Sequence, residues 1–252
     1  DKYLNSENFL AEIQEEVEYG ENRTEPKQIL IDFVPKFLEK LSGLEKEKWA
    51  EIFAILSEGV EQKHILAYFK DQTMEKAALA GGFGGEIKKT EQDYLSVVHT
   101  NVKGSKSDAV TENSYILKSN LNSEGLDHAL SIIRKHRGGK HDLGFYNRTN
   151  YDYVRVLVPA GSTLLDISGH SLVKFSPIAD YDNGEFVTDA DLAEYEKGAS
   201  QIRPGVKAWR EAGKTVFGFW LNVEPGKTEK VVLKYQTPVQ IKNGDYSLLV
   251  QK

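Results

Sequence analysis

The sequence contains no cysteine among its 252 residues. Disulfide bonds, thiol nucleophiles and thiolate metal sites are therefore excluded. No apolar run approaches the ~18 residues that a membrane-spanning helix needs, so the sequence predicts no span. The chain starts without Met and ends in an apparent strand, so we expect a fragment or processed product whose signal peptide or membrane anchor lies outside it.

A strong excess of one charge is also missing from most of the chain. Residues 1–90 contain 12 Lys+Arg and 18 Asp+Glu, whereas residues 91–252 contain 20 of each. Neither part has the basic surplus typical of a nucleic-acid-binding protein, so nucleic acid is not expected as a partner. The 40% hydrophobic and 28% charged residues are typical of a folded chain long enough to bury a substantial core.

The first part of the chain shows apolar residues at helical spacing. Three such stripes cover residues 9–17, 29–41 and 49–56. Pro35 lies inside the second stripe and predicts a kink or a break there. We expect all three stripes to be buried, and the alternative is a helical hairpin surface that binds a partner.

A connecting segment follows the helical pattern. Residues 64–69, HILAYF, predict a strand, and Asp71 is expected to cap a short helix that ends near Ala80. The GGFGG cluster at residues 81–85 predicts a flexible break, and it lacks the Gly-Lys-Ser/Thr ending of a phosphate-binding loop.

From Asp93 onward the hydrophobic period changes from helical to two. We predict a helix over residues 189–198 and strands over residues 93–102, 109–122, 126–136, 150–158, 173–177, 184–187, 214–223 and 230–238. Strands spaced this closely, without long helices between them, favour antiparallel sheets. The predicted fold class is α+β, with a helical segment (1–62), a connecting segment (63–92) and a mostly antiparallel β-sandwich (93–252).

The stretch NVKGSKSDAV at residues 101–110 places a Gly, two Lys, two Ser and an Asp between two predicted strands. Lys106 and Ser107 are neighbours that point to opposite faces of a strand, so they do not form a dyad. Turn chemistry explains every residue type present, and we expect a polar hairpin in which Asp108 pairs locally with Lys106. Asn101, Lys106 and Asp108 are the candidate binding residues, as one exposed turn.

Two other groups of residues give weaker indications of a metal site. His136, His141 and Asp142 flank a predicted turn and are an alternative zinc site, although a solvated turn without metal is favoured. The acidic residues 180–191 lack the EF-hand spacing, and a different calcium site there remains open. We assign no catalytic residue, no metal ligand and no cofactor.

Aromatic residues offer a further alternative. A platform that stacks on sugars is one interpretation, and burial in the core or in strand pairs is the favoured one. The residues concerned are Tyr146, Tyr151, Tyr153, Trp209 and Trp220.

The order of several segments resembles a known family. The segments are PKQILIDFVPKFLEKL, KHILAYFKD, GGFGGEI, DYLSVVHTNVKGSKSDAV, NYDYVRVLVPAGSTLL and GKTVFGFWLNVEPGKTEKVVLKYQTP. Together they are similar to the C-terminal half of the bacterial envelope family called domain of unknown function 4012. The resemblance implies a membrane-anchored protein that faces outward from a bacterial cell. The family's upstream half is similar to the LytR–CpsA–Psr cell-wall ligases, and no counterpart of that half is present here.

We therefore expect a non-catalytic extracytoplasmic module of the cell envelope or cell surface. It is expected to bind a protein or a cell-wall glycan, or to act in surface assembly, with any membrane anchor outside this chain. The alternative is the accessory half of a cell-wall glycopolymer transferase, in which Arg134, Arg137, Arg148 and Arg155 line a cleft. A third interpretation is a surface sandwich with a Lys–Asn crosslink beside a buried acid. The sequence assigns no ligand, host or oligomeric state.

Overall fold

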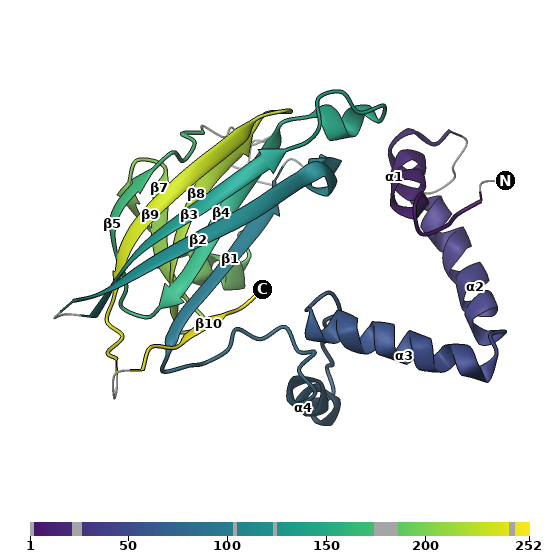
Figure 1. Ribbon diagram of the computed structural model, residues 1–252, viewed down its shortest axis with the longest axis horizontal. Helices are drawn as coiled ribbons and strands as arrows, with labels where there is room; N and C mark the ends of the chain where they lie inside the picture. Colours follow the sequence, from purple (N-terminus) through teal and green to yellow (C-terminus); the bar gives the residue numbers. More distant parts are fainter. Residues whose placement is uncertain (1–2, 22–26, 103–104, 123–124, 174–185, 242–244) are drawn as a thin grey trace. The chain divides into compact units, whose positions relative to one another are not determined.

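The computed structural model describes residues 3–21, 27–102, 105–122, 125–173, 186–241 and 245–252. The chain divides into two compact units, Asp1–Glu86 and Ile87–Lys252. The first unit is helical, and the second holds the strands (Figure 1), of which the described residues form ten. The fold class is α+β, as predicted.

The helical unit contains α1 (Phe9–Tyr19), α2 (Gln28–Ser42), α3 (Lys46–Glu61) and α4 (Gln72–Ala80). Asp71 caps α4 as predicted, because its carboxylate accepts the backbone N–H groups of Thr73 and Met74, both at 2.9 Å. α2 continues through Pro35 as one helix, so the chain does not break there. A proline removes one hydrogen bond of the ladder and leaves the others in place.

Two predictions for this unit are wrong. Residues 64–69 form no strand, because this extended run has no neighbouring strand to pair with among the described residues, and Ala67 N–H donates to Phe83 O instead. The apolar stripes of α2 and α3 contain no buried residue. α1 contacts α2 through the rings of Phe9 and Phe33, whose centroids are 5.3 Å apart, and within the described residues of this unit the rest of the stripe is exposed or half-buried.

The second unit is a sandwich of two sheets. The six-stranded sheet has the order β10-β1-β4-β8-β7-β6, and the four-stranded sheet has the order β2-β3-β9-β5. All pairs are antiparallel except β1 with β10. The strands of the larger sheet are β1 (Asp93–Asn101), β4 (Asn150–Pro159), β6 (Ser200–Arg203), β7 (Val206–Glu211), β8 (Lys214–Val223) and β10 (Leu248–Val250). Those of the smaller sheet are β2 (Thr111–Asn122), β3 (Gly125–His136), β5 (Thr163–Ser168) and β9 (Thr228–Thr237).

Sequence reasoning missed β5, β6 and β7, which are short or lack clear alternation. Most of the predicted strand 173–177 and half of the predicted strand 184–187 lie outside the described residues, and Val173, Phe186 and Val187 are not in a strand. The predicted helix is present as α5 (Ala190–Glu196), capped by Asp189. A second short element, the 3-10 helix η2 (Gly144–Asn147), connects β3 to β4.

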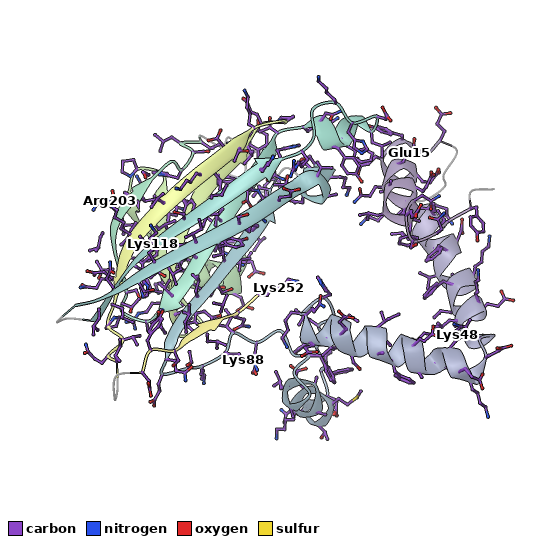
Figure 2. The ribbon with its side chains drawn as sticks, in the orientation of Figure 1. Glu15, Lys48, Lys88, Lys118, Arg203 and Lys252 are labelled. Carbon is purple, nitrogen blue, oxygen red and sulfur yellow. The ribbon has the colours of Figure 1, made fainter. Side chains whose placement is uncertain are left out.

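Exposed charged residues mark the edge strands. Lys118 lies on β2 and Arg203 on β6, each the outermost strand of its sheet (Figure 2). An exposed edge offers unpaired backbone groups to another chain, and charged side chains discourage such pairing.

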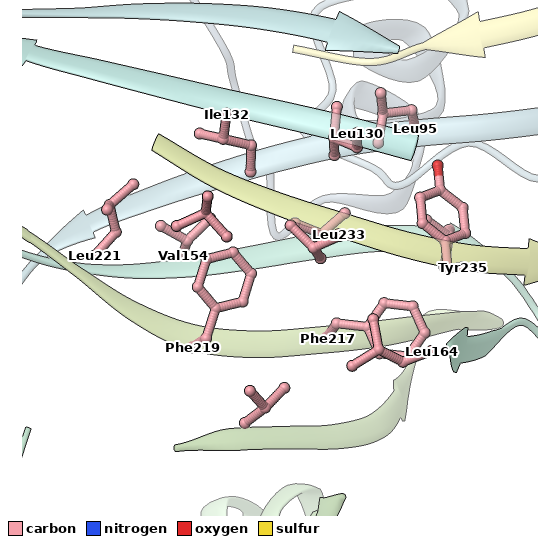
Figure 3. Close-up of a cluster of buried hydrophobic side chains, with 14 of the residues drawn as sticks. Leu95, Leu130, Ile132, Val154, Leu164, Phe217, Phe219, Leu221, Leu233 and Tyr235 are labelled. Carbon is pink, nitrogen blue, oxygen red and sulfur yellow. The ribbon is translucent and has the colours of Figure 1, made fainter. Parts of the chain in front are cut away.

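The core lies between the two sheets. Inward side chains alternate along each strand, so that Val154, Val156 and Val158 of β4 are all fully buried. They pack with Phe217 and Phe219 of β8 and with apolar residues of the opposite sheet (Figure 3). At ~25 cal/mol per Å² of apolar surface, this cluster is the main stabilisation of the sandwich.

The stretch 101–110 does not form a hairpin, so that prediction is wrong. β1 belongs to the six-stranded sheet and β2 to the four-stranded sheet, and between them lies a 3-10 helix, η1 (Lys106–Val110). The stretch is therefore a corner between layers, and part of the predicted turn (103–104) lies outside the described residues. The predicted Pro225-Gly226 turn is present, with Lys227 N–H donating to Glu224 O at 3.0 Å, and it also joins strands of different sheets.

Candidate functional site

A line of polar side chains follows the open side of the sandwich, where β1 and β2 face each other. We call this line the polar seam. It comprises Asp93, His99, Asn101, Ser107, Asp108, Asn113, Tyr115, Ser119, His128, Arg134, Asn150 and Asp152. Several of these groups are fully buried, and buried polar groups need partners to avoid a large desolvation cost.

Arg134 is the centre of one end of the polar seam. It is 1% exposed and donates to Asp108 Oδ1 at 2.5 Å, to Asn113 Oδ1 at 2.8 Å and to Asn150 Oδ1 at 3.0 Å. Asp152 Oδ2 lies 3.5 Å from the same guanidinium. Because these partners come from both sheets and from η1, Arg134 ties the corner to both layers.

Asp152 also connects to an imidazole. Its side chain is 0% exposed, and His99 Nδ1 lies 2.5 Å from Asp152 Oδ2. The other ring nitrogen of His99 lies 2.8 Å from the Tyr115 hydroxyl. Burial raises the pKa of Tyr115 despite the opposing effect of Arg134, so this phenol keeps its proton.

The predicted binding residues belong to this end of the polar seam. Asp108 pairs with Arg134, whose Nη2 lies 2.5 Å from Asp108 Oδ1, and the local salt bridge with Lys106 stays a prediction. Asn101 is half-buried and donates to Ser105 O at 2.5 Å, while Lys106 is half-buried at the start of η1. Contact with a partner through Asn101, Lys106 and Asp108 stays a prediction, although the Asp108 carboxylate is already engaged inside the fold.

The opposite end of the polar seam contains a second carboxylate–imidazole pair. His128 Nε2 lies 3.1 Å from Asp93 Oδ2, and Ser119 Oγ lies 2.8 Å from His128 Nδ1. The contact with Asp93 is short but poorly aligned for a hydrogen bond. Burial raises the pKa of Asp93, but the neighbouring His128 and hydrogen bonds from the Tyr246 hydroxyl and the Tyr94 backbone together outweigh burial, so the pKa lies below its ordinary value.

The four arginines of the alternative transferase hypothesis do not converge. Arg134 points into the sandwich, whereas Arg155 lies on the outer face of the six-stranded sheet and pairs with Glu211 at 2.9 Å. Arg137 pairs with Glu112 at the surface, and Arg148 is exposed. The described residues thus provide no common arginine cleft.

The outer face of the six-stranded sheet carries an aromatic group. Trp209, Tyr153 and Trp220 are half-buried there, and Tyr153 meets Trp220 edge to face with centroids 5.1 Å apart. A side chain at Gly218 would clash with the Trp209 ring and the Tyr153 hydroxyl, so this glycine provides the space they fill. Trp209 Nε1 donates to Glu211 Oε2 at 3.0 Å, which fixes the indole.

The other aromatic candidates divide between two places. Tyr151 also lies on β4, two residues from Tyr153, and is half-buried. Tyr146 is 4% exposed in η2, where it packs against Phe145 and His141, so it is not part of the outer aromatic group.

A groove of about 1010 Å³ runs beside Trp209. Its lining combines apolar surface with hydroxyls, carboxylates and cations around that single aromatic residue. The lining residues are Gly161, Ser162, Asp191, Glu194, Lys197, Gly198, Ala208, Trp209, Arg210 and Thr215. Trp209 therefore belongs both to the groove and to the outer aromatic group.

Lys214 is the buried lysine of the described residues. It is 4% exposed, and its ammonium lies 3.9 Å from the centroid of the Tyr94 ring. Burial lowers its pKa. The neighbour that the structure gives this lysine is an aromatic ring rather than an asparagine, so the crosslink prediction gains no support from it.

The remaining sequence candidates were a metal site and a membrane span. No cluster of three or more His, Asp or Glu residues suited to a metal ion occurs in the described parts of the chain. Both ring nitrogens of His136 already contact backbone groups, Arg148 O at 2.9 Å and Gly138 N at 3.0 Å. Among the described helices, none has the length and apolarity that crossing a bilayer requires.

Comparisons of the chain with family models, with curated proteins and with solved structures find no match. The resemblance to the domain of unknown function 4012 family stays a prediction.

Proposed function

We propose that this chain is an extracytoplasmic module of the cell envelope that binds a cell-wall glycan through the groove beside Trp209. The observation that carries the proposal is the position of Trp209, which joins this groove to the outer aromatic group. Location and anchoring follow the sequence expectation and form part of the proposal.

The chemistry of the groove suits a sugar. A sugar ring offers an apolar face of C–H groups that packs on an indole, and a rim of hydroxyls that needs many hydrogen-bonding partners. Ser162, Thr215 and Arg210 provide hydroxyl and guanidinium groups, while Asp191 and Glu194 of α5 provide acceptors. The mixed charge favours a glycan that is neutral or contains both charges over a polyanion.

The indole is held in place before binding. Glu211 accepts its N–H and is itself held by Arg155, and Gly218 provides the surface against which the ring packs. A ring that is already ordered loses little conformational entropy when a ligand stacks on it, and affinity benefits accordingly.

The test is isothermal titration calorimetry with soluble peptidoglycan fragments and wall-polysaccharide oligomers. Trp209→Ala is expected to weaken binding about tenfold or more, as expected for a central aromatic contact. Trp49→Ala is the matched control, because Trp49 is also half-buried but lies in α3 of the other unit.

If Trp209→Ala and Trp49→Ala both bind the glycan with the same affinity, the proposal is wrong. If both variants fold and neither binds, recognition is not specific to the groove beside Trp209 and lies elsewhere. Absence of binding to any of these glycans, together with capture of an envelope protein that depends on Trp209, would move the proposal from glycan to protein recognition.

A further inference from the structure

We infer that Ser119 is a nucleophile activated by His128 and oriented by Asp93, which accepts acyl groups from activated esters. This site lies on the polar seam, apart from the groove beside Trp209, and departs from the expectation of a non-catalytic module. The inference therefore stands independently of glycan binding.

The three side chains come from three strands and both sheets. Ser119 on β2 and His128 on β3 are directly opposed cross-strand partners, and Asp93 comes from β1 of the other sheet. Ser119 is exposed, whereas His128 and Asp93 are 3% and 1% exposed. An accessible hydroxyl next to a buried base and a buried carboxylate is the arrangement that nucleophilic catalysis requires.

The partners of Asp93 determine the tautomer of His128. Asp93 Oδ2 accepts the Tyr246 hydroxyl at 2.7 Å and Oδ1 accepts the Tyr94 N–H at 2.9 Å, as an ionised carboxylate does. The negative charge of that carboxylate, 3.1 Å from Nε2, favours the tautomer whose proton is on Nε2, and the proposal takes this tautomer. Nδ1 is left with a lone pair 2.8 Å from Ser119 Oγ, ready to take the hydroxyl proton.

The other carboxylate–imidazole pair of the polar seam differs in two respects. Asp152 is shared with Arg134, which neutralises part of its charge, and His99 contacts a phenol that keeps its proton. Among the described residues, Asp93 forms an ion pair with His128 and none with an arginine. Its charge is therefore less neutralised than that of Asp152, and the Ser119 end is the reactive one.

The reaction balances without any further reagent. Ser119 Oγ bonds to the acyl carbon while its proton moves to His128 Nδ1, and the bond to the leaving oxygen breaks as that oxygen takes the proton. The product is a serine ester, which water hydrolyses by the reverse sequence. The base is the main source of activation, so we expect reaction with esters that have good leaving groups rather than with amides.

A depression of about 260 Å³ lies beside the carboxylate of this site. It is lined by Asp93 and by Tyr246, which donates its hydroxyl to Asp93 Oδ2 at 2.7 Å, together with Gln92 and Ser247.

The experiment treats the full chain with a fluorophosphonate, which phosphonylates activated serines as the P–F bond breaks and fluoride leaves. Mass spectrometry is expected to show an adduct at Ser119 that is lost in Ser119→Ala and kept in Ser114→Ala. Ser114 is the matched control, because it is exposed on the opposite face of the same strand. His128→Gln is expected to slow labelling about 100-fold, the lower end for loss of a general base.

Asp93 is a positioning residue and needs a separate readout. Asp93→Asn places an amide beside Nε2, so the nitrogen-15 shifts of His128 should report a change of tautomer in parallel with slower labelling. No adduct at Ser119, or an adduct whose rate is unchanged by His128→Gln, overturns the inference. If His128→Gln fails to fold, the comparison of Ser119→Ala with Ser114→Ala still decides, because labelling equal in both overturns it.

Discussion

The helical unit and the sandwich use their apolar residues differently. In the sandwich, two sheets enclose a continuous cluster from β1, β3, β4, β5, β7, β8 and β9. In the helical unit, Ile13 and Ala78 are the buried apolar residues, while Phe37, Phe53 and Ile55 are 49–67% exposed. A sheet face is buried by one opposing sheet, but an amphipathic helix needs neighbours along its whole stripe.

The difference indicates where stability and precise geometry reside. Packed interiors fix side-chain positions, and every group proposed here to bind or react lies in the sandwich. Tertiary packing supplies most helical stability in proteins, and it is sparse among the described helices of this unit. These helices therefore depend more on local interactions such as caps.

Phe219→Ala should have the largest effect on stability. Phe219 is 0% exposed in the core, and removing a buried phenyl ring costs about 3–5 kcal/mol through lost burial and a cavity. Phe53→Ala in α3, where the ring is 62% exposed, is the matched change and should alter the sandwich transition very little. Chemical denaturation followed by circular dichroism measures both, and similar losses would break the contrast.

Arg134→Ala should have a comparable effect for an electrostatic reason. Removing one member of a buried charged network leaves the Asp152 carboxylate without its arginine and Asn150 Oδ1 without this donor, a change that costs about 3–5 kcal/mol. Arg137→Ala removes a surface pair with Glu112 instead and should leave the unfolding free energy within experimental error. Denaturant midpoints of the two variants give the comparison, and equal midpoints would contradict the role given to Arg134.

Acid should weaken the sandwich through Asp93. The pKa of Asp93 is lower in the folded protein than its ordinary value of 3.8, so the folded state favours the carboxylate. This stabilisation is complete well above pH 3.8, is lost as the pH falls through the lower folded pKa, and amounts to about 1.4 kcal/mol per pKa unit. Unfolding free energies measured across that range should show a smaller pH dependence in Asp93→Asn, and an unchanged slope would contradict the assignment.

Asp71→Ala should have the smallest effect, and a local one. Loss of the cap of α4 costs about 1 kcal/mol and should speed hydrogen exchange at the amides of Thr73 and Met74. Exchange in β4 and β8 is expected to stay unchanged. Faster exchange there as well would show that the two units unfold together.

Periodicity predicted the layers, because inward and outward residues must alternate in a half-buried strand. It did not predict the burial of α2 and α3, since a helical stripe shows that a face is apolar and not that another element covers it. The corner at Lys106–Val110 was mistaken for a hairpin because turn residues indicate a reversal of direction without indicating which sheet the next strand joins.

Sequence patterns also identify the residues of the candidate sites only in part. Trp209 and Tyr153 could be selected by residue type, and alternation placed Arg155 on the same face as Tyr153. The pair Ser119 and His128 could also have been found, because antiparallel pairing of the predicted strands 109–122 and 126–136 with Asn122 opposite Gly125 places them opposite each other. Their connection to Asp93, and that of Arg134 to Asp152, comes from packing between sheets, which no local pattern encodes.

The three tryptophans allow a direct test of the claim that recognition resides on the sandwich. Each indole N–H gives a separate signal in a nitrogen-15 correlation spectrum, and glycan can be titrated into the full chain while all three are observed. The account predicts that the Trp209 signal moves most, that Trp220 moves less and that Trp49 of α3 stays in place. A shift confined to Trp49, or no shift at Trp209 at saturation, would contradict it.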